Sequence, residues 1–440
     1  MERQIISSAN VKPSLPTPQT LRRYNFSMLD QIFPPMPIPV VFYFSDASLD
    51  DPDSSIPQIT DHLTRSLSLI LTRFYPLAGR ATAEAEFIDC NDAGVPFSVA
   101  RFRGLTLPEL LATPRPDLLL PAPDCGVSAV AAVQLNFFDC GGVAIGVVFW
   151  NKAVDATTVV AVLRAWGAAA RGGHEAVCPN YMAQYMFPQK ESVPAQLGST
   201  ADIVKIGKSV VRRYVFSASA TSSLESKASN VADPTGAELV AALMWKCFMS
   251  ASHANGKSTS FLTQTIDLRR RAVPPFPKEC FGNLQALAAA TCPNDPSPPL
   301  GSLVAKMRES AAKIDGGYVD RMRGDGGLMG YYENLRRVWI GYSEEFDVLP
   351  ISSLCGGGVY GVDFGWGKPA WFSKCDSGGE AEVWNRVWLN DTRSGGGIEA
   401  WVILEEEYMK VFERVEDLRG LAIVDPNPLS SDEVGLFAKL

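Results

Sequence analysis

The stretch Asp363-Phe364-Gly365-Trp366-Gly367, which reads DFGWG, is the most distinctive five-residue string in the chain. One acid and two glycines surround two aromatic residues, and Lys368 and Pro369 follow directly. Glycine reaches backbone conformations that other residues avoid, so two glycines at this spacing favour a tight turn. Taken alone, the string predicts a structural turn held by an acid–base pair.

A second informative segment is WNKAVD, residues 150–155, which separates a strand-like run from a helix-like run. Residues 143–149 (VAIGVVF) are apolar and β-branched, as strands are. Asp155 is a typical helix N-cap, and apolar residues recur after it at helical spacing until Gly172-Gly173. We therefore expect a strand-to-helix turn at a sheet edge, a common location for chemistry.

Strand and helix patterns alternate along both halves of the chain. In the first half, residues 37–45 and 128–135 read as strands, and a helix is expected from Thr60 or Asp61 to Pro76. In the second half, 210–217, 260–268, 359–364, 383–389 and 398–404 read as strands, 236–251 as a helix and 325–333 as a mobile Gly-rich stretch. The alternation predicts α/β layers with mixed sheets.

Length and charge limit the classes of function. The chain has 440 residues, enough for two domains, with 46% hydrophobic and 20% charged residues. Lys plus Arg total 40 against 48 Asp plus Glu, a net charge of −8. This balance argues against nucleic acid or an anionic membrane as the main partner. No apolar run is long enough to span a bilayer, and the first residues resemble no secretory or transit signal, so a cytoplasmic location is expected.

Cysteine and histidine usage excludes some chemistry. Nine Cys residues occur without a C-x-x-C pair, which indicates reduced thiols rather than disulfides or a zinc site. Only three His are present, His62, His174 and His253. The glycine clusters at 324–327 and 356–358 match no phosphate-binding motif. We expect no metal and no organic cofactor.

Taken with other segments, DFGWG resembles the second signature of the BAHD family of plant acyl-CoA-dependent acyltransferases, and most of all its alkaloid-pathway, vinorine synthase-like branch. The matching strings occur in family order: KPSLPTP (12–18), MLDQ (28–31), FYPLAGR (74–80), DCNDAGVPF (89–97), FDCGGVAIG (138–146), DLRRRAVPPFP (267–277), GN (282–283) and DTRSGGGIEAW (391–401). The resemblance covers nearly the whole chain.

The resemblance implies two α/β domains of similar size, each a mixed sheet flanked by helices, as in chloramphenicol acetyltransferase. A solvent channel would run between them. We place the first domain at 1–185, a crossover loop at 186–207 and the second domain at 208–440. The family is usually monomeric, and acyl-CoA would be a co-substrate that meets a small-molecule acceptor in the channel.

The resemblance also implies roles for individual residues. The family's first signature is H-x-x-x-D, whose His deprotonates the acceptor and whose Asp orients the site, usually through an Arg. Asp155 matches that Asp, and Arg269 is expected to pair with Asp155 or with Asp363. DFGWG would support the fold away from the chemistry.

The sequence departs from the family at the signature His, where it has Asn151. An Asn carboxamide cannot take up a proton near pH 7, although it donates and accepts hydrogen bonds. Loss of a general base typically costs about 10²–10⁴-fold in rate. Trp150, which precedes it, either narrows the channel or packs in the core.

Three hypotheses follow. The first is acyl transfer from acyl-CoA to an amine or hydroxyl of a plant specialised metabolite, with Asn151 and Asp155 at an atypical active site. The second is a lyase or cyclase reaction in the same channel, in which Asn151 holds a carbonyl. The third is a non-catalytic metabolite-binding protein.

Overall fold

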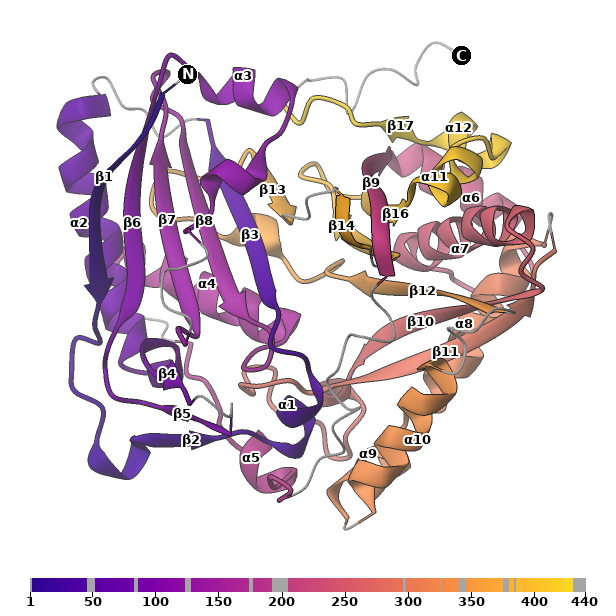
Figure 1. Ribbon diagram of the computed structural model, residues 1–440, viewed down its shortest axis with the longest axis horizontal. Helices are drawn as coiled ribbons and strands as arrows, with labels where there is room; N and C mark the ends of the chain where they lie inside the picture. The colour runs from indigo at the N-terminus through magenta and orange to yellow at the C-terminus, as the bar shows by residue number, and fades with distance from the viewer. Residues whose placement is uncertain are drawn as a thin grey trace.

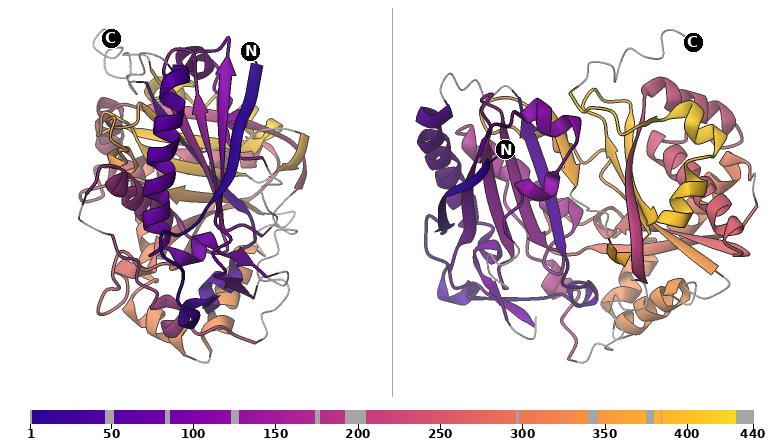
Figure 2. Two further views of the ribbon diagram at one scale, coloured as in Figure 1. Left: turned by 90° about the vertical axis from the view of Figure 1, so that its left-hand side faces the viewer. Right: turned by 45° about the horizontal axis from the view of Figure 1, so that its top comes forward.

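The structure is a computed structural model that describes residues 2–45, 52–82, 86–122, 128–173, 177–191, 205–295, 298–324, 326–339, 346–374, 380–383 and 385–429. Two lobes lie side by side, and each is built on one large β-sheet (Figures 1 and 2). Elements from the first half of the chain form most of one lobe, and elements from the second half form the other.

The first lobe contains a sheet of six described strands in which only β6 and β7 pair in parallel. In spatial order they are β1 (Glu2–Val11), β6 (Val95–Arg103), β7 (Ala131–Phe137), β8 (Val143–Trp150), β3 (Pro37–Phe44) and β13 (Trp371–Lys374). Strand β13 falls within the range 208–440 that the sequence assigned to the second domain. The sheet of the first lobe therefore includes a strand from the second half of the chain.

Two long helices, α2 (Pro52–Leu71) and α4 (Ala156–Ala170), pack against one another in the first lobe. The Trp166 indole of α4 donates hydrogen bonds to the Leu63 carbonyl at 3.2 Å and to Ser66 Oγ at 3.1 Å, both in α2. Buried aliphatic residues of α2 and α4 join the strand side chains in one core. Helix α4 is thereby fixed by its neighbour as well as by its cap.

The second lobe contains a mixed sheet in which β12 pairs in parallel with both neighbours and the other pairs are antiparallel. In spatial order the described strands are β11 (Gln285–Pro293), β10 (Thr259–Asp267), β12 (Phe346–Ser353), β15 (Arg386–Asp391), β16 (Ile398–Glu405), β9 (Lys205–Phe216) and β14 (Glu380–Val383), with β17 (Ile423–Val424) also on β9. The helices of this lobe include α6 (Ala218–Lys227), α7 (Gly236–Ala254), α8 (Leu300–Ala312), α11 (Glu406–Phe412) and α12 (Glu416–Leu421). Helix α7 is buried nearly all round and is the centre of this lobe's core.

The remaining described elements complete the fold. They are the small sheet β2 (Arg23–Asn25), β5 (Phe87–Asp89) and β4 (Arg80–Ala81), the helices α1 (Met28–Ile32), α3 (Leu107–Ala112), α5 (Ala183–Met186), α9 (Gly316–Arg323) and α10 (Gly327–Trp339), and the 3₁₀ turns Gln19–Leu21, Tyr75–Ala78, Pro116–Leu119, Leu268–Arg270 and Val359–Gly361. Reciprocal capping boxes begin α1, α3 and α7, at Ser27, Thr106 and Thr235. These side chains satisfy amide groups that a helix start leaves without partners.

Three expectations about helices and strands were wrong. Helix α2 begins at Pro52 rather than near Asp61, because proline is tolerated at the first helical position, where an N–H would have no partner. The Gly-rich stretch 325–333 contributes most of its described residues to α10, anchored by buried Leu328 and Tyr331. Residues 359–364 form a 3₁₀ turn and a bend, and the strand comes later, at β13.

The sequence-based fold class is confirmed: two α/β lobes, each a mixed sheet flanked by helices, with a cavity between them. Most of the crossover 186–207, residues 192–204, lies outside the described residues. Within the described ranges, no helix is both long and apolar enough to cross a lipid bilayer.

Candidate active site

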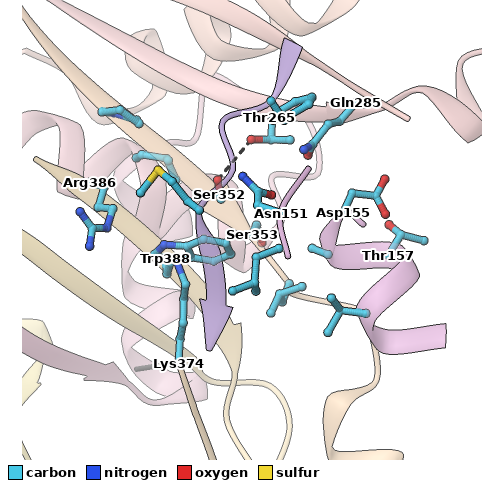
Figure 3. Close-up of a pocket in the computed structure, with 18 of the residues that line it drawn as sticks. Asn151, Asp155, Thr157, Thr265, Gln285, Ser352, Ser353, Lys374, Arg386 and Trp388 are labelled. Carbon is cyan, nitrogen blue, oxygen red and sulfur yellow. Dashed lines mark hydrogen bonds between the residues drawn. The ribbon is translucent and has the colours of Figure 1, made fainter. Parts of the chain in front are cut away.

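A cavity of about 310 Å³ lies between the two lobes. The first lobe lines it with the end of α1 and the following loop, the turn at Asn151, the start of α4, and strands β3 and β13. The second lobe lines it with β10, β11, β12 and β15. Figure 3 shows the polar side chains from both lobes around this space, with Asn151 near the centre.

The backbone of the turn after β8 is held from two directions. The Asn151 amide donates to the Met36 carbonyl at 2.8 Å. From the second lobe, Asn283 Nδ2 donates to the carbonyls of Asn151 at 2.9 Å and Lys152 at 3.1 Å. These contacts involve only backbone atoms of Asn151, and its side chain lines the cavity. Among the described residues, none forms a hydrogen bond with its carboxamide.

Asn283 is itself fixed by Asp30, a buried residue of α1. Asp30 Oδ1 accepts from the Asn283 amide at 2.7 Å and from Asn283 Nδ2 at 3.2 Å. Burial raises the pKa of Asp30 to about 6, against the opposing effect of hydrogen bonds from Asn283 and Ser27. Burial also lowers the pKa of Lys152, although the Asp30 charge acts in the opposite direction.

Asp155 caps α4 and pairs with Arg269. Its Oδ1 accepts from the Thr158 amide at 2.8 Å, which is the N-cap expected from the sequence. Arg269 donates to Oδ2 at 2.7 Å and to Oδ1 at 3.1 Å, and the Leu284 amide also donates to Oδ2 at 3.1 Å. Of the two carboxylates that the sequence left open for Arg269, the structure pairs it with Asp155.

This ion pair is buried, with 3% of the Asp155 side chain and 1% of the Arg269 side chain exposed. Burial alone would lower the pKa of Arg269, but the carboxylates of Asp155 and Asp267 outweigh it and raise the pKa above its ordinary value. Both oxygens of Asp155 are occupied by donors, so its carboxylate fixes the turn and α4 against the second lobe.

The DFGWG segment forms a turn away from the cavity. Asp363 Oδ1 accepts from the amides of Gly365 at 2.8 Å and Gly367 at 2.9 Å. Gly365 has φ 111° and Gly367 has φ 97°, in the left-handed region that disfavours other residues. The expected acid–base pair is wrong: among the described residues the carboxylate holds backbone amides, while Arg171 donates to the Asp363 carbonyl oxygen.

Aromatic packing joins this turn to the first lobe. The Phe364 ring lies 4.9 Å from the Trp166 ring of α4 and 5.9 Å from that of Phe44 in β3, measured between centroids. The Trp366 ring is 5.8 Å from the Phe44 ring. None of the five DFGWG residues lines the cavity.

Trp150, His62 and His253 lie outside the cavity lining. The Trp150 ring packs edge-on to Phe26 at 5.7 Å and against the core of the first lobe. His62, in the middle of α2, has its Nε2 3.3 Å from the Phe364 carbonyl oxygen, and His253 lies in the last turn of α7. His174 lies outside the described residues. No histidine is among the described residues that line the cavity.

Sequence reasoning missed several cavity residues that come from distant strands. Thr265 and Ser352 share a hydrogen bond of 3.2 Å between hydroxyls, and Gln285 lies beside them (Figure 3). Lys374 Nζ lies 3.3 Å from the centroid of the Trp388 ring. The sequence predicted the strands of Thr265 and Trp388 but not β11, β12 or β13, which carry Gln285, Ser352 and Lys374. Only the pairing of the sheets reveals which face of each strand turns to the cavity. The strings MLDQ and GN did contain Asp30 and Asn283, without indicating that they contact each other.

Residues 1–418 match the model of the Transferase family, which is nearly the whole chain. The chain belongs to this family, the BAHD acyltransferases. It is 34% identical over 438 residues to a limonoid 21-O-acetyltransferase of Melia azedarach, covering 97% of this chain and 99% of that protein. It is 33% identical over 429 residues to stemmadenine O-acetyltransferase of Catharanthus roseus, covering 93% and 95%.

The crystal structure of vinorine synthase superposes with a TM-score of 0.77 at 30% identity, covering 93% of this chain and 96% of that one. The BAHD membership and the two-lobed, chloramphenicol acetyltransferase-like fold that the sequence implied are therefore confirmed. Within this BAHD fold, the segment 150–155 lies at the interface of the lobes, with Asn151 on the cavity wall.

Among the described residues, no group of three or more His, Cys, Asp or Glu side chains is arranged to hold a metal ion. Among the described residues, the polar groups that line the cavity are the carboxamides of Asn151 and Gln285, several hydroxyls, the carboxylates of Asp155 and Asp267, and the side chains of Lys374 and Arg386. Both carboxylates accept hydrogen bonds from Arg269. Such a site can position and polarise a carbonyl group by hydrogen bonding.

Proposed function

We propose that this BAHD protein transfers an acyl group from acyl-CoA to an amine or hydroxyl group of a plant specialised metabolite, and that Asn151 stands where its relatives use a catalytic histidine. One observation carries the proposal. The turn from Asn151 to Asp155 is held from both lobes, and its first residue faces a cavity formed by both. This arrangement supports a transferase binding site in which no described lining residue supplies an imidazole.

In the proposed reaction the acceptor atom attacks the thioester carbonyl carbon. A bond from carbon to nitrogen or oxygen forms, the carbon–sulfur bond breaks, and CoA leaves as a thiolate that takes up the proton released by the acceptor. Asn151 Nδ2 can donate to the oxygen that becomes negative, or its Oδ1 can accept from an acceptor N–H. Positioning of the two reactants supplies the rest of the rate enhancement.

Amine acceptors suit this site better than alcohols. A neutral amine attacks without prior loss of a proton, whereas an alcohol benefits strongly from a general base. Without the base, the rate with alcohols is expected to be about 10²–10⁴-fold lower than in an enzyme that has one.

The test measures free CoA after incubation with acetyl-CoA and a panel of amines and alcohols, for the wild type, Asn151→His and the control Asn230→His, an exposed position. We expect release with amines in the wild type, a large gain with alcohols in Asn151→His, and no change in the control. No release by either the wild type or Asn151→His would contradict acyl transfer. Release by Asn151→His alone would indicate a protein that binds metabolites without catalysis.

A second candidate is a lyase or cyclase reaction in the same cavity. It is favoured by the absence of histidine from the described lining and by the presence of Asn151, Gln285 and the Thr265–Ser352 hydroxyl pair, which can hold a carbonyl. The carboxylate of the substrate itself would then serve as the base. Conversion of a metabolite without any thioester present distinguishes this reaction from acyl transfer.

We further propose that the protein acts as a monomer in the cytoplasm. Size-exclusion chromatography with light scattering tests the first point, and imaging of a fluorescent fusion in plant cells tests the second.

A further inference from the structure

The orientation of the Asn283 side-chain amide is fixed by its neighbours. Its Nδ2 lies 2.9 Å from the carbonyl oxygen of Asn151, 3.1 Å from that of Lys152 and 3.2 Å from Asp30 Oδ1. Carbonyl oxygens only accept hydrogen bonds, and Asp30 Oδ1 already accepts from the Asn283 backbone amide. The NH₂ group of Asn283 therefore faces these three oxygens, and its own carbonyl oxygen, Oδ1, points away from them.

Gln285 continues this series of amides toward the cavity. Its Nε2 donates to Asn283 Oδ1 at 3.4 Å. Two carbonyl oxygens repel each other at such a distance, so the NH₂ group is the end of the Gln285 amide that faces Asn283. The orientation of buried Asn283 thus determines that of Gln285, and the carbonyl oxygen of Gln285, Oε1, is the end left for another partner.

The Gln285 side chain lines the cavity between the lobes. It lies on β11, diagonally across from Thr265 on the paired strand β10, and both residues are on the cavity wall that includes Asn151 (Figure 3). Among the described residues, none donates a hydrogen bond to Gln285 Oε1. A ligand in the cavity therefore meets a hydrogen-bond acceptor of fixed direction at this position.

The first lobe's part of the lining is largely apolar, with Ile32, Met36, Val159 and Leu163 among its residues. A ligand that enters such a cavity gives up its hydrogen bonds to water. An N–H or O–H group left without a new acceptor weakens binding, because its desolvation is not compensated. Gln285 Oε1 supplies that acceptor, whereas a ligand carbonyl or ether oxygen placed there would face another oxygen.

We propose that Gln285 is a specificity-determining residue that accepts a hydrogen bond from an uncharged N–H or O–H group of a substrate. The inference rests on the proposed function for its use of the cavity as a substrate site. The donor would belong either to the acceptor, as a hydroxyl or N–H group on an apolar ring system, or to the pantetheine arm of acyl-CoA, which carries amide and hydroxyl groups.

The test is binding measured by isothermal titration calorimetry, independently of turnover. The probes are indole, carbazole and thymol, each compared with its N-methyl or O-methyl derivative, which keeps the ring system and removes the donor. Acetophenone is added as a probe that only accepts. We expect at least one donor probe to bind about 3- to 10-fold more tightly than its methyl derivative, as for a hydrogen bond between neutral groups.

The preference for the donor probe should fall below about twofold in Gln285→Met, which keeps the length of the side chain and removes its polar atoms. It should persist in Gln285→Glu, whose carboxylate only accepts, and in the control Gln58→Met, at an exposed position of α2 outside the cavity lining. Gln285→Val, which suits a strand, serves if Gln285→Met does not fold.

Titration of CoA into the same variants identifies which substrate carries the donor. A probe preference that depends on Gln285 assigns the donor to the acceptor. CoA binding that weakens about 3- to 10-fold in Gln285→Met, without such a preference, assigns it to the pantetheine arm.

The proposal is overturned if neither the probes nor CoA depend on Gln285, or if Gln285→Glu abolishes the preference as Gln285→Met does. Selective weakening of acetophenone binding in Gln285→Met would also overturn it, because the NH₂ group would then face the cavity. Since no step requires transfer, a protein that fails the CoA-release assay can still pass this one, and the two proposals fail separately.

Discussion

Replacement of Arg269 by Met tests the buried ion pair on which the turn at Asn151 depends. Among the described residues, the substitution leaves the buried Asp155 carboxylate with only the backbone amides of Thr158 and Leu284 as donors. It also removes the donors to the carbonyls of Cys280 at 2.7 Å and Gly282 at 3.3 Å. Removing one partner of a buried pair typically costs about 3–5 kcal/mol, because the remaining charge is not compensated.

A loss of this size is a large part of the total stability of a folded protein, which is about 5–15 kcal/mol. The assay is urea unfolding followed by tryptophan fluorescence and circular dichroism, for Arg269→Met, Asp155→Asn and the double variant. The first transition is compared, since proteins with two lobes often unfold in more than one step. The double variant should lose less than the sum of the single losses, because a neutral carboxamide at position 155 no longer needs a cation.

Arg115→Met is the matched control, because Arg115 pairs with Asp117 in an exposed ion pair. Exposed pairs contribute about 0–1 kcal/mol, so this variant should unfold almost as the wild type does. A loss below about 1 kcal/mol for Arg269→Met, or strict additivity in the double variant, would refute the reasoning.

Three further predictions follow from the site. His62→Asn should leave CoA release within about twofold of the wild type, because His62 contacts the Phe364 carbonyl outside the cavity lining and so cannot serve as the base. A loss of about 100-fold in the same assay would contradict the proposal that Asn151 has replaced the catalytic histidine. The pH profile of kcat/KM with an amine acceptor should follow the pKa of that amine, with no inflection near about 6.5 from an imidazole, as steady-state rates between about pH 5 and 9 will show. The raised pKa of Asp30 means that the folded state holds this proton to higher pH than the unfolded chain. Its contribution to stability is therefore present below pH 3.8 and is lost as the pH rises to about 6. The loss amounts to roughly 3 kcal/mol relative to Asp30→Asn. If the free energy of unfolding of the two proteins changes equally with pH over this range, the prediction is wrong.

The local structure around the turn could be predicted from sequence because its signals are local. Asp155 follows a β-branched run and precedes apolar residues at helical spacing, so its role as N-cap requires only short-range chemistry. The same reasoning failed for α2, because Thr60 and Asp61 are typical N-cap residues but lie inside a helix that spans Pro52–Leu71. Glycines misled in the same way at α10, where buried Leu328 and Tyr331 outweigh the low helix propensity of glycine.

The composition of the cavity could not be predicted, because it depends on long-range pairing. Strand β13 has four residues and pairs with β3, which lies in the first tenth of the chain. No local pattern indicates that Lys374 reaches Trp388, since the two side chains belong to different sheets and meet only when the lobes dock. The same holds for Asn283. Its side-chain amide donates a hydrogen bond to the Asn151 carbonyl from the other lobe, and no spacing of residues in the sequence predicts this contact.

The contacts at the two ends of the segment 151–155 explain why family motifs alone do not determine the reaction. Asp155 binds Arg269, caps α4 and accepts from Leu284, so the fold itself needs this carboxylate whatever chemistry takes place. Asn151 is different, because its backbone is held while its carboxamide faces the cavity. The side chain at position 151 can therefore change with little effect on the fold, whereas the one at position 155 cannot. Exchange of the side chain at position 151 is therefore the experiment that reports on chemistry rather than on folding.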